Sequence, residues 1–158
     1  GRICVVLTGR VEHCDILHGL MHDAGLDARA LHGRVKRAER ARVLDDARAG
    51  RVPVIIATTV ADEGLDLPIL ASVVLAFPAR AKGRTEQRVG RLMRPHPRKT
   101  DAVVYDLLDA NVPPLRRQHA ERRLVFAEIL GVKPSAIEPP HPLHHLPPLN
   151  SLDRRCAT

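Results

Sequence analysis

Two arginines and a glutamine lie one helical turn apart in the segment 86–95. On a helix, Gln87, Arg91 and Arg94 occupy positions i, i+4 and i+7 and form one polar stripe. Guanidinium groups make charge-assisted, paired hydrogen bonds to phosphate oxygens, so the stripe suits an anion with several oxygens, such as a triphosphate. Gly90 costs about 1 kcal/mol relative to Ala in a helix, which indicates a close approach to its backbone. The alternative is the solvated basic face of a surface helix.

A second polar cluster, in residues 57–68, follows an apolar run directly. Two Thr, one Gly and three carboxylates in so short a segment are unsuited to a core. The hydroxyl of Thr58 could hold a phosphate, and Asp66 could accept hydrogen bonds from a sugar hydroxyl. The alternative is the start of a helix, with Thr58 or Thr59 as its N-cap.

A scaffold must position these segments, and the hydrophobic pattern predicts one. Continuous apolar runs rich in β-branched residues are typical of parallel strands covered on both faces. These runs alternate with segments of helical length, which indicates βαβ units. Ligands of such sheets bind at the carboxyl ends of the strands, where the polar loops are expected. Strands are predicted at 3–7, 28–31, 52–57, 71–77 and 102–105, and helices at about 11–24, 36–49, 84–94 and 114–130.

Composition limits the partners of the chain. It carries 25 Lys and Arg against 18 Asp and Glu, a net charge of +7, which favours nucleic acid as a partner, although a coding bias toward Arg would produce the same excess. Aromatic residues are 2%, too few to stack unpaired bases, so contacts to phosphates are expected. No apolar run approaches the ~20 residues of a membrane span, so no membrane partner is expected. Three widely spaced Cys fit a reducing, intracellular compartment, cytoplasmic or nucleoid-associated in a bacterium.

In their order and spacing, these motifs resemble the second RecA-like domain of superfamily 2 helicases and translocases. Residues 57–68 are similar to motif V of that family, and residues 87–95 are similar to motif VI. The segment 62–66, Asp-Glu-Gly-Leu-Asp, looks like the XPB-like and type III restriction-like branch. DEAD-box RNA helicases usually carry Asp where Thr59 stands and His where Gln87 stands. The resemblance implies an α/β fold, a RecA-like open parallel sheet with helices on both faces.

Two weaker motifs extend the resemblance. Residues 31–33, Leu-His-Gly, followed by Arg40, look like the motif between IV and V, and the segment 7–13 is similar to motif IV of the XPB-like branch. The resemblance implies contacts from both stretches to the phosphate backbone of a nucleic acid. The residues implied to face that backbone are Thr58, Gly33 and Arg40, with Thr8 and Arg10 as further candidates.

The resemblance also implies roles at a nucleotide. Arg91 and Arg94 would be arginine fingers that reach the γ-phosphate of ATP on a partner domain, where such a group can contribute ~10³–10⁵ in rate. Gln87 would orient this pair or touch the nucleotide. Gly64 and Asp66 would border the ribose and phosphates and couple the nucleotide to the strand-binding loop.

The sequence contains no Gly-x-x-x-x-Gly-Lys-Ser/Thr loop and no Asp-Glu-x-His run. In this family those motifs belong to the first, N-terminal RecA-like domain. The chain is therefore interpreted as a piece of a longer ATP-dependent helicase, an NTP hydrolase, and is expected to be inactive alone. ATP and Mg²⁺ would be bound mainly by the N-terminal RecA-like domain. The expected partners are that domain and the backbone of DNA, with RNA as the alternative.

The 158 residues divide into three expected parts. Residues 1–110 form the RecA-like domain, and residues 111–133 form a C-terminal helical extension whose helix ends at Gly131. Residues 134–158 form a Pro/His-rich linker or flexible tail. The helix of the extension is open to three interpretations: contact with nucleic acid, a solvated face, or docking to the missing lobe. Its expected basic surface is Arg116, Arg117, His119, Arg122 and Arg123, and its expected packing residues are Leu124, Ala127 and Leu130.

Several other interpretations are kept in view. Cys14, His18 and His22 have the i, i+4, i+8 spacing that can bring metal ligands together, but no fourth ligand is evident, so no metal site is expected. Within the motor class, the chain could belong to an RNA helicase or to a restriction or remodelling motor that translocates without unwinding. Outside it, the chain could be a non-catalytic module that binds a phosphate backbone, or an unrelated doubly wound domain for a small phosphorylated ligand.

Overall fold

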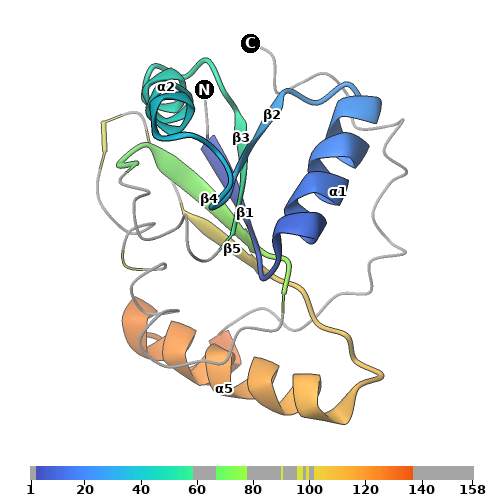
Figure 1. Cartoon of the computed structure of the whole chain (residues 1–158). Coiled ribbons are helices and arrows are strands. Elements are labelled where there is room, and N and C mark those ends of the chain that lie inside the picture. The colour runs from blue at the N-terminus through green and yellow to red at the C-terminus, as the bar shows by residue number, and fades with distance from the viewer. Residues whose placement is uncertain are drawn as a thin grey trace.

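Five parallel strands form a single sheet in the order β2-β3-β1-β4-β5 (Figure 1). The structure, a computed structural model, describes residues 3–58, 67–77, 90, 96–97, 99 and 102–136. The strands are β1 (Ile3–Thr8), β2 (Ala28–Leu31), β3 (Val54–Thr58), β4 (Leu70–Leu75) and β5 (Val103–Asp106). The helices are α1 (Val11–Asp23), α2 (Arg37–Arg48) and α5 (Pro113–Leu130), and a short 3-10 turn, η1, spans Pro134–Ala136.

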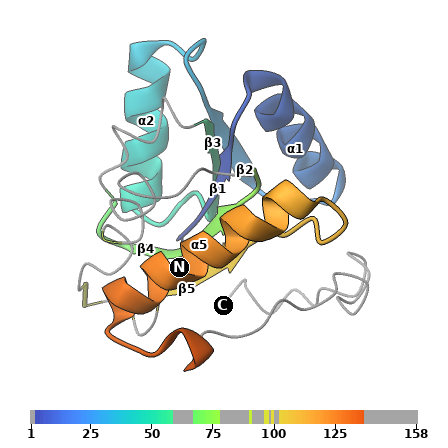
Figure 2. The same cartoon turned by 90° about the horizontal axis from the view of Figure 1, so that it is seen from below.

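Both faces of the sheet are covered, as continuous hydrophobicity predicts. Because successive side chains of a strand point to opposite faces, Val5 and Leu7 of β1 enter one core cluster with Val43 of α2. Val6 enters a second cluster with Cys14 of α1. Figures 1 and 2 show α1 and α2 on opposite sides of the strands. The predicted α/β, RecA-like sheet with helices on both faces is confirmed.

The strand order places β1 at the centre of the sheet. The chain runs from β1 outward to β2 and back to β3 on one side, and then crosses to β4 and β5 on the other. Thr8 of β1 is the register partner of Thr58 of β3, and Leu7 is the partner of Leu75 of β4. The carboxyl ends of β1, β3 and β4 therefore lie side by side at the point where the order reverses, which is where open parallel sheets bind ligands.

Helix α5 lies along the β5 side of the sheet (Figures 1 and 2). Its Phe126 is 7% exposed and belongs to the same core cluster as Val5 and Val43. The helix ends at Gly131, whose φ of 64° is the left-handed conformation that glycine adopts without a steric cost. This end of the helix agrees with the expectation from sequence.

The expected basic surface of α5 is wrong at two of its five positions. Arg122 is 1% exposed and His119 is 9% exposed. The guanidinium of Arg122 donates from Nε and Nη2 to the two carboxylate oxygens of Asp106, both at 2.8 Å. A buried guanidinium needs such a paired carboxylate because an unpaired charge is costly to bury. Asp106 of β5 supplies this carboxylate, which allows Arg122 to be buried.

The prediction of the packing residues of α5 is right at one of three positions. Ala127 is 2% exposed and packs as predicted, whereas Leu124 and Leu130 are 58% and 43% exposed. The helix buries Val125, Phe126 and Ala127 instead. The inward stripe is displaced from the predicted one because Arg122 and His119 lie on it.

Two further expectations concern residues that lie mostly outside the described ranges. Of the predicted helix 84–94, only Gly90 is among the described residues, and its backbone is helical. No described atom lies within 4 Å of the position that a Cβ on Gly90 would take. Of the expected tail, residues 134–136 form η1, and residues 137–158 lie outside the description. No helix in the described ranges is both long enough and apolar enough to cross a membrane.

Replacing Arg122 with Ala is expected to lower the free energy of unfolding by about 3–5 kcal/mol, because it leaves the Asp106 carboxylate buried without its cation. Urea unfolding followed by circular dichroism measures the change. The matched control is Arg51→Ala, which removes a contact from Nε and Nη2 to Asp46 Oδ1 between side chains 65% and 42% exposed. That loss is expected to stay below about 1 kcal/mol. Equal losses in the two variants would contradict the account of Arg122.

His119 is expected to make the fold less stable in mild acid. Burial lowers the pKa of His119 below its ordinary value of 6.5, against the Asp106 carboxylate, which raises it, and with the Arg122 and Arg123 cations, which lower it further. The unfolded chain therefore binds the proton more tightly, so this contribution is complete above pH 6.5 and declines as the pH falls toward the lower folded value.

The test compares urea unfolding of the wild-type chain and the His119→Gln variant between pH 7.5 and 5. As the pH falls, the free energy of unfolding of the wild-type chain should decrease more than that of the variant. Parallel profiles would contradict the role of His119, since the two proteins differ only at this position.

Candidate nucleic-acid interface

Thr8 and Thr58 lie side by side at the carboxyl edge of the sheet, as register partners at the ends of β1 and β3. Both are buried, with exposures of 0% and 4%. The Thr8 hydroxyl donates to the carbonyl of Arg10 at 3.2 Å, so this side chain shapes the turn from β1 into α1. The predicted contacts of Thr8 and Thr58 with a nucleic-acid backbone stay predictions.

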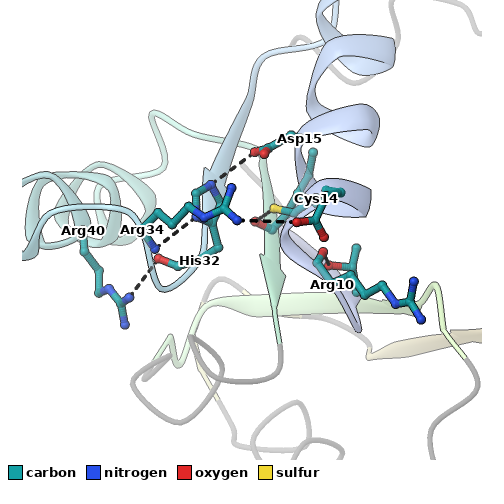
Figure 3. A network of polar contacts seen from close by, with 9 residues as sticks. Arg10, Cys14, Asp15, His32, Arg34 and Arg40 are labelled. Carbon is teal, nitrogen blue, oxygen red and sulfur yellow. Dashed lines mark hydrogen bonds and ion pairs between the residues drawn. The ribbon is translucent and has the colours of Figure 1, made fainter.

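Arg10 directly precedes α1 and is exposed. It occupies the N-cap position, and its own side chain makes no capping hydrogen bond to the first amides of the helix. Figure 3 shows the Arg10 side chain extending away from the network formed by its neighbours. A cation and a helix N-terminus therefore lie together beside the end of β1, and both attract anions.

The loop after β2 is built around His32, whose contacts Figure 3 displays. The His32 carbonyl accepts hydrogen bonds from the Val35 amide at 3.0 Å and from Nη2 of Arg40 at 3.1 Å. Its ring Nδ1 accepts from the Arg34 amide at 3.3 Å, and its Nε2 lies 3.2 Å from Oδ1 of Asp15. This residue therefore connects the end of β2 to both α1 and α2.

Gly33 and Arg40, which the sequence assigns to a backbone contact, are brought together by this loop. Gly33 is exposed, and apart from its chain neighbours no described residue comes within 4 Å of where its Cβ would be. Arg40 is half-buried in the first turn of α2, and its hydrogen bond to the His32 carbonyl holds its guanidinium against the loop. The Arg34 and Val35 amides are engaged by His32, so the arrangement can present the exposed Gly33 backbone and the Arg40 guanidinium to phosphate oxygens at one place.

Acidic side chains accompany the cations of this edge. Glu12 accepts from Nη2 of Arg34 at 3.5 Å, with both side chains more than two-thirds exposed. Asp15 faces His32, as described above. Such exposed pairs are worth little in stability. They nevertheless distinguish Arg34, which has a carboxylate beside it, from Arg10, which makes no ion pair within the described part of the chain.

The Cys14, His18 and His22 stripe of α1 does not converge on a common point. The Cys14 thiol donates to the carbonyl of Ile56 at 3.2 Å, and His18 Nε2 lies 3.2 Å from the carbonyl of Ala28. Burial, with the Asp15 carboxylate adding to it, raises the pKa of Cys14 to about 11, so the thiol stays protonated near neutral pH. In the described ranges no group of three or more His, Cys, Asp or Glu is placed to hold a metal ion.

Five predicted site residues lie outside the described residues: Arg91, Arg94, Gln87, Gly64 and Asp66. Their predicted roles at a nucleotide stay predictions. Conversely, the motifs assign no individual role to His32, Asp15, Arg34 or Glu12, which the structure joins in one network with Arg40. The available signal was a His at a strand end directly before a Gly, but its partner Asp15 lies 17 residues earlier on a different element.

Comparison with known proteins agrees with this architecture. Residues 1–96, more than half of the chain, match the helicase conserved C-terminal domain. The chain therefore belongs to the helicase C-terminal domain family, and the expected resemblance to superfamily 2 helicases is confirmed at that level.

Among sequence relatives, the ATP-dependent RNA helicase DBP2 of Encephalitozoon cuniculi is 37% identical over 91 residues, covering 57% of this chain and 18% of the relative. The UvrABC system protein B of Chlorobium chlorochromatii is 28% identical over 145 residues, covering 87% of this chain and 21% of the relative. The chain thus spans about a fifth of the length of these curated relatives.

Two solved structures share the fold. The C-terminal domain of the DEAD-box protein Dbp5 superposes with a TM-score of 0.65 at 24% identity, over 80% of this chain and 71% of that one. The Hef helicase domain of Pyrococcus furiosus superposes with a TM-score of 0.57 at 28% identity, over 76% of this chain and 24% of that one. The sheet and its helices are therefore those of a helicase C-terminal lobe.

Proposed function

We propose that this chain is the C-terminal motor lobe of an ATP-dependent helicase or translocase that acts on nucleic acid, with DNA as the substrate. The observation that carries the proposal is the position of Gly33 and Arg40, which lie together at the carboxyl edge of a sheet in a chain of the helicase C-terminal domain family. The net charge of +7 supports a polyanionic partner. The residues of the segments 62–66 and 87–95 support DNA as the substrate, because they resemble those of the XPB-like branch.

The mechanism divides the work between two lobes. This lobe grips one stretch of the phosphate backbone through the loop 32–36 and Arg40. Arg91 and Arg94 reach across to the γ-phosphate held by the N-terminal lobe and stabilise the charge that develops during phosphoryl transfer. The guanidinium pair gains these bonds only when the lobes are closed, so binding and loss of the phosphate shift the equilibrium between closed and open forms. Alternating grip and release moves the protein along the strand.

Mg²⁺ is assigned to the N-terminal lobe. The carboxylates of the described carboxyl edge, Glu12 and Asp15, are paired with Arg34 and His32 rather than gathered around one point. Hard cations such as Mg²⁺ need converging oxygen ligands. By the resemblance, this lobe would act on ATP through the guanidinium groups of Arg91 and Arg94, with Gln87, Gly64 and Asp66 beside the nucleotide.

An RNA helicase lobe is the second candidate, because DBP2 and DBP5 are named as ATP-dependent RNA helicases. The alignments with these two proteins have identities of 37% and 31%, and each covers 57% of this chain. The two candidates share the lobe and its mechanism and differ in the sugar of the strand that is gripped.

Binding of the 158-residue chain to matched DNA and RNA oligonucleotides should weaken linearly in log affinity against log salt, because phosphate contacts release counterions. Arg40→Ala should reduce the slope by about 1, while Arg51→Ala, a change of equal charge at the amino end of β3, should leave it unchanged. Tighter binding to DNA supports the first candidate and tighter binding to RNA supports the second. Affinity that does not respond to salt would refute both.

In the intact parent protein, Arg94→Ala is expected to lower ATP turnover by about 10³–10⁵ while strand binding is retained, because the guanidinium acts on the transition state. The matched control is Arg88→Ala, which removes the same side chain from the same segment at a position off the stripe of Gln87, Arg91 and Arg94. Steady-state phosphate release measures both. Near-normal turnover in the Arg94 variant would refute the finger assignment.

A further inference from the structure

His32 uses each of its polar side-chain and carbonyl groups within the chain. Its carbonyl accepts from the Val35 amide and from the Arg40 guanidinium, and its ring contacts Arg34 through Nδ1 and Asp15 through Nε2. The side chain is only 12% exposed, although it stands at the edge of the sheet. Figure 3 shows His32 between Asp15 of α1 and the side chain of Arg40. A residue so enclosed has little surface left with which to touch a ligand itself.

The contacts define one tautomer of the ring. Nδ1 accepts a hydrogen bond from a backbone amide, which requires its lone pair, so the proton of a neutral imidazole is on Nε2. Nε2–H then donates to the Asp15 carboxylate. Asp15 thereby favours the tautomer that leaves Nδ1 free to accept from the Arg34 amide, and the two contacts support each other.

The ring also closes a turn. A side-chain acceptor on one residue that binds the amide two positions later is the arrangement that Asn and Asp make in turns. Here the Nδ1 of His32 takes that place toward the Arg34 amide, and the His32 carbonyl spans one residue further to the Val35 amide. Gly33 is thereby held outward at the tip of the turn, where it is exposed.

The same residue directs Arg40. A guanidinium has five N–H donors in a rigid plane, and the 3.1 Å hydrogen bond from Nη2 to the His32 carbonyl ties this group to the loop. The remaining donors then point in a defined direction. Holding a binding group in its bound orientation beforehand raises affinity because less conformational freedom is lost on binding.

We propose that His32 is a positioning residue for the nucleic-acid backbone, and that its bridge to Asp15 holds the Gly33 tip and the Arg40 guanidinium in the arrangement that meets the phosphates. The inference rests on the proposed function, because it assigns to His32 the placement of groups that this function uses. His32 acts through Gly33 and Arg40 and does not contact the strand itself.

Four variants of the 158-residue chain separate the two halves of the bridge. His32→Ala removes both contacts. His32→Asn keeps an acceptor for the Arg34 amide but is too short to reach Asp15, and Asp15→Ala removes the partner alone. The matched control is His22→Ala, which breaks the other His–Asp pair of α1, His22 with Asp23 at 3.6 Å, where both side chains are more than four-fifths exposed.

Affinity is measured by fluorescence anisotropy with a labelled single-stranded oligonucleotide, of DNA or RNA according to which binds the wild type. Titration at high concentration gives the fraction of active protein, which separates misplaced groups from lost folding. His32→Ala is expected to weaken binding about 5- to 30-fold at an unchanged active fraction. His32→Asn and Asp15→Ala should fall between this variant and the wild type, and His22→Ala should stay within about twofold of the wild type.

A double-mutant cycle completes the test. Because His32 and Asp15 act as one unit, the variant with both changed to Ala should bind no more weakly than His32→Ala alone. Additive losses, no recovery by Asn, or a lower active fraction as the whole cause would each overturn the positioning role. If His32→Ala binds normally while Arg40→Ala does not, the proposed function stands and this inference fails. If the wild type binds no oligonucleotide at all, the proposed function itself fails.

Discussion

Parallel pairing of β1 with both β3 and β4 is the constraint on which the rest of this structure depends. Parallel strands bring their carboxyl ends to one edge, so the ends of β1, β2 and β3, with the residues that directly follow β1 and β2, lie there together although they are far apart in sequence. The register partners Thr8 and Thr58 mark that edge on the two central strands. Without this pairing, the cations Arg10 and Arg40 and the turn at Gly33 would lie at unrelated places on the surface of a basic chain.

The charges of the edge are arranged rather than simply accumulated. Arg34 has Glu12 beside it, and His32 has Asp15, so these groups are directed by carboxylates of the first turns of α1. Arg40 is directed instead by a neutral carbonyl, which orients its guanidinium without neutralising its charge. Among the described residues, Arg40 therefore keeps a guanidinium without a carboxylate partner, whereas the charge of Arg34 is compensated by Glu12. Net charge alone, +7 over the chain, does not distinguish the two.

Much of the fold could be predicted from the sequence, because apolar continuity and helix-breaking residues are local signals. The predicted strand 28–31 and the end of the last helix at Gly131 agree with the structure. Strand β3 begins at Val54 rather than at residue 52, since Pro53 has no amide to donate to a ladder. Strand β4 ends at Leu75, two residues before the predicted end. Boundaries depend on such hydrogen bonds, which hydrophobicity does not report.

The pairings of charged side chains could not be predicted in the same way. Arg122 has the same type and the same helical context as the exposed Arg116 and Arg117, and only the position of Asp106, 16 residues earlier on β5, separates it from them. Likewise, nothing local to His32 indicates Asp15. These contacts arise from the crossover geometry of the sheet, which brings a helix against the end of a strand, so a single sequence shows the residue types without showing the pairs.

The Arg122–Asp106 pair shows what such contacts add to the domain. A buried ion pair is a weak source of stability compared with apolar residues of the same volume, because desolvation offsets most of the attraction. Its geometry is demanding, however, since two oxygens must meet two donors, and here both bonds are 2.8 Å long. The apolar packing of Phe126 is non-directional and would tolerate several positions of the helix. The paired hydrogen bonds between the guanidinium and the carboxylate form at only one of these positions. The pair therefore specifies where α5 lies on the sheet, and because Asp106 is the last residue of β5, it does so at the same edge of the sheet at which the loop around His32 is held.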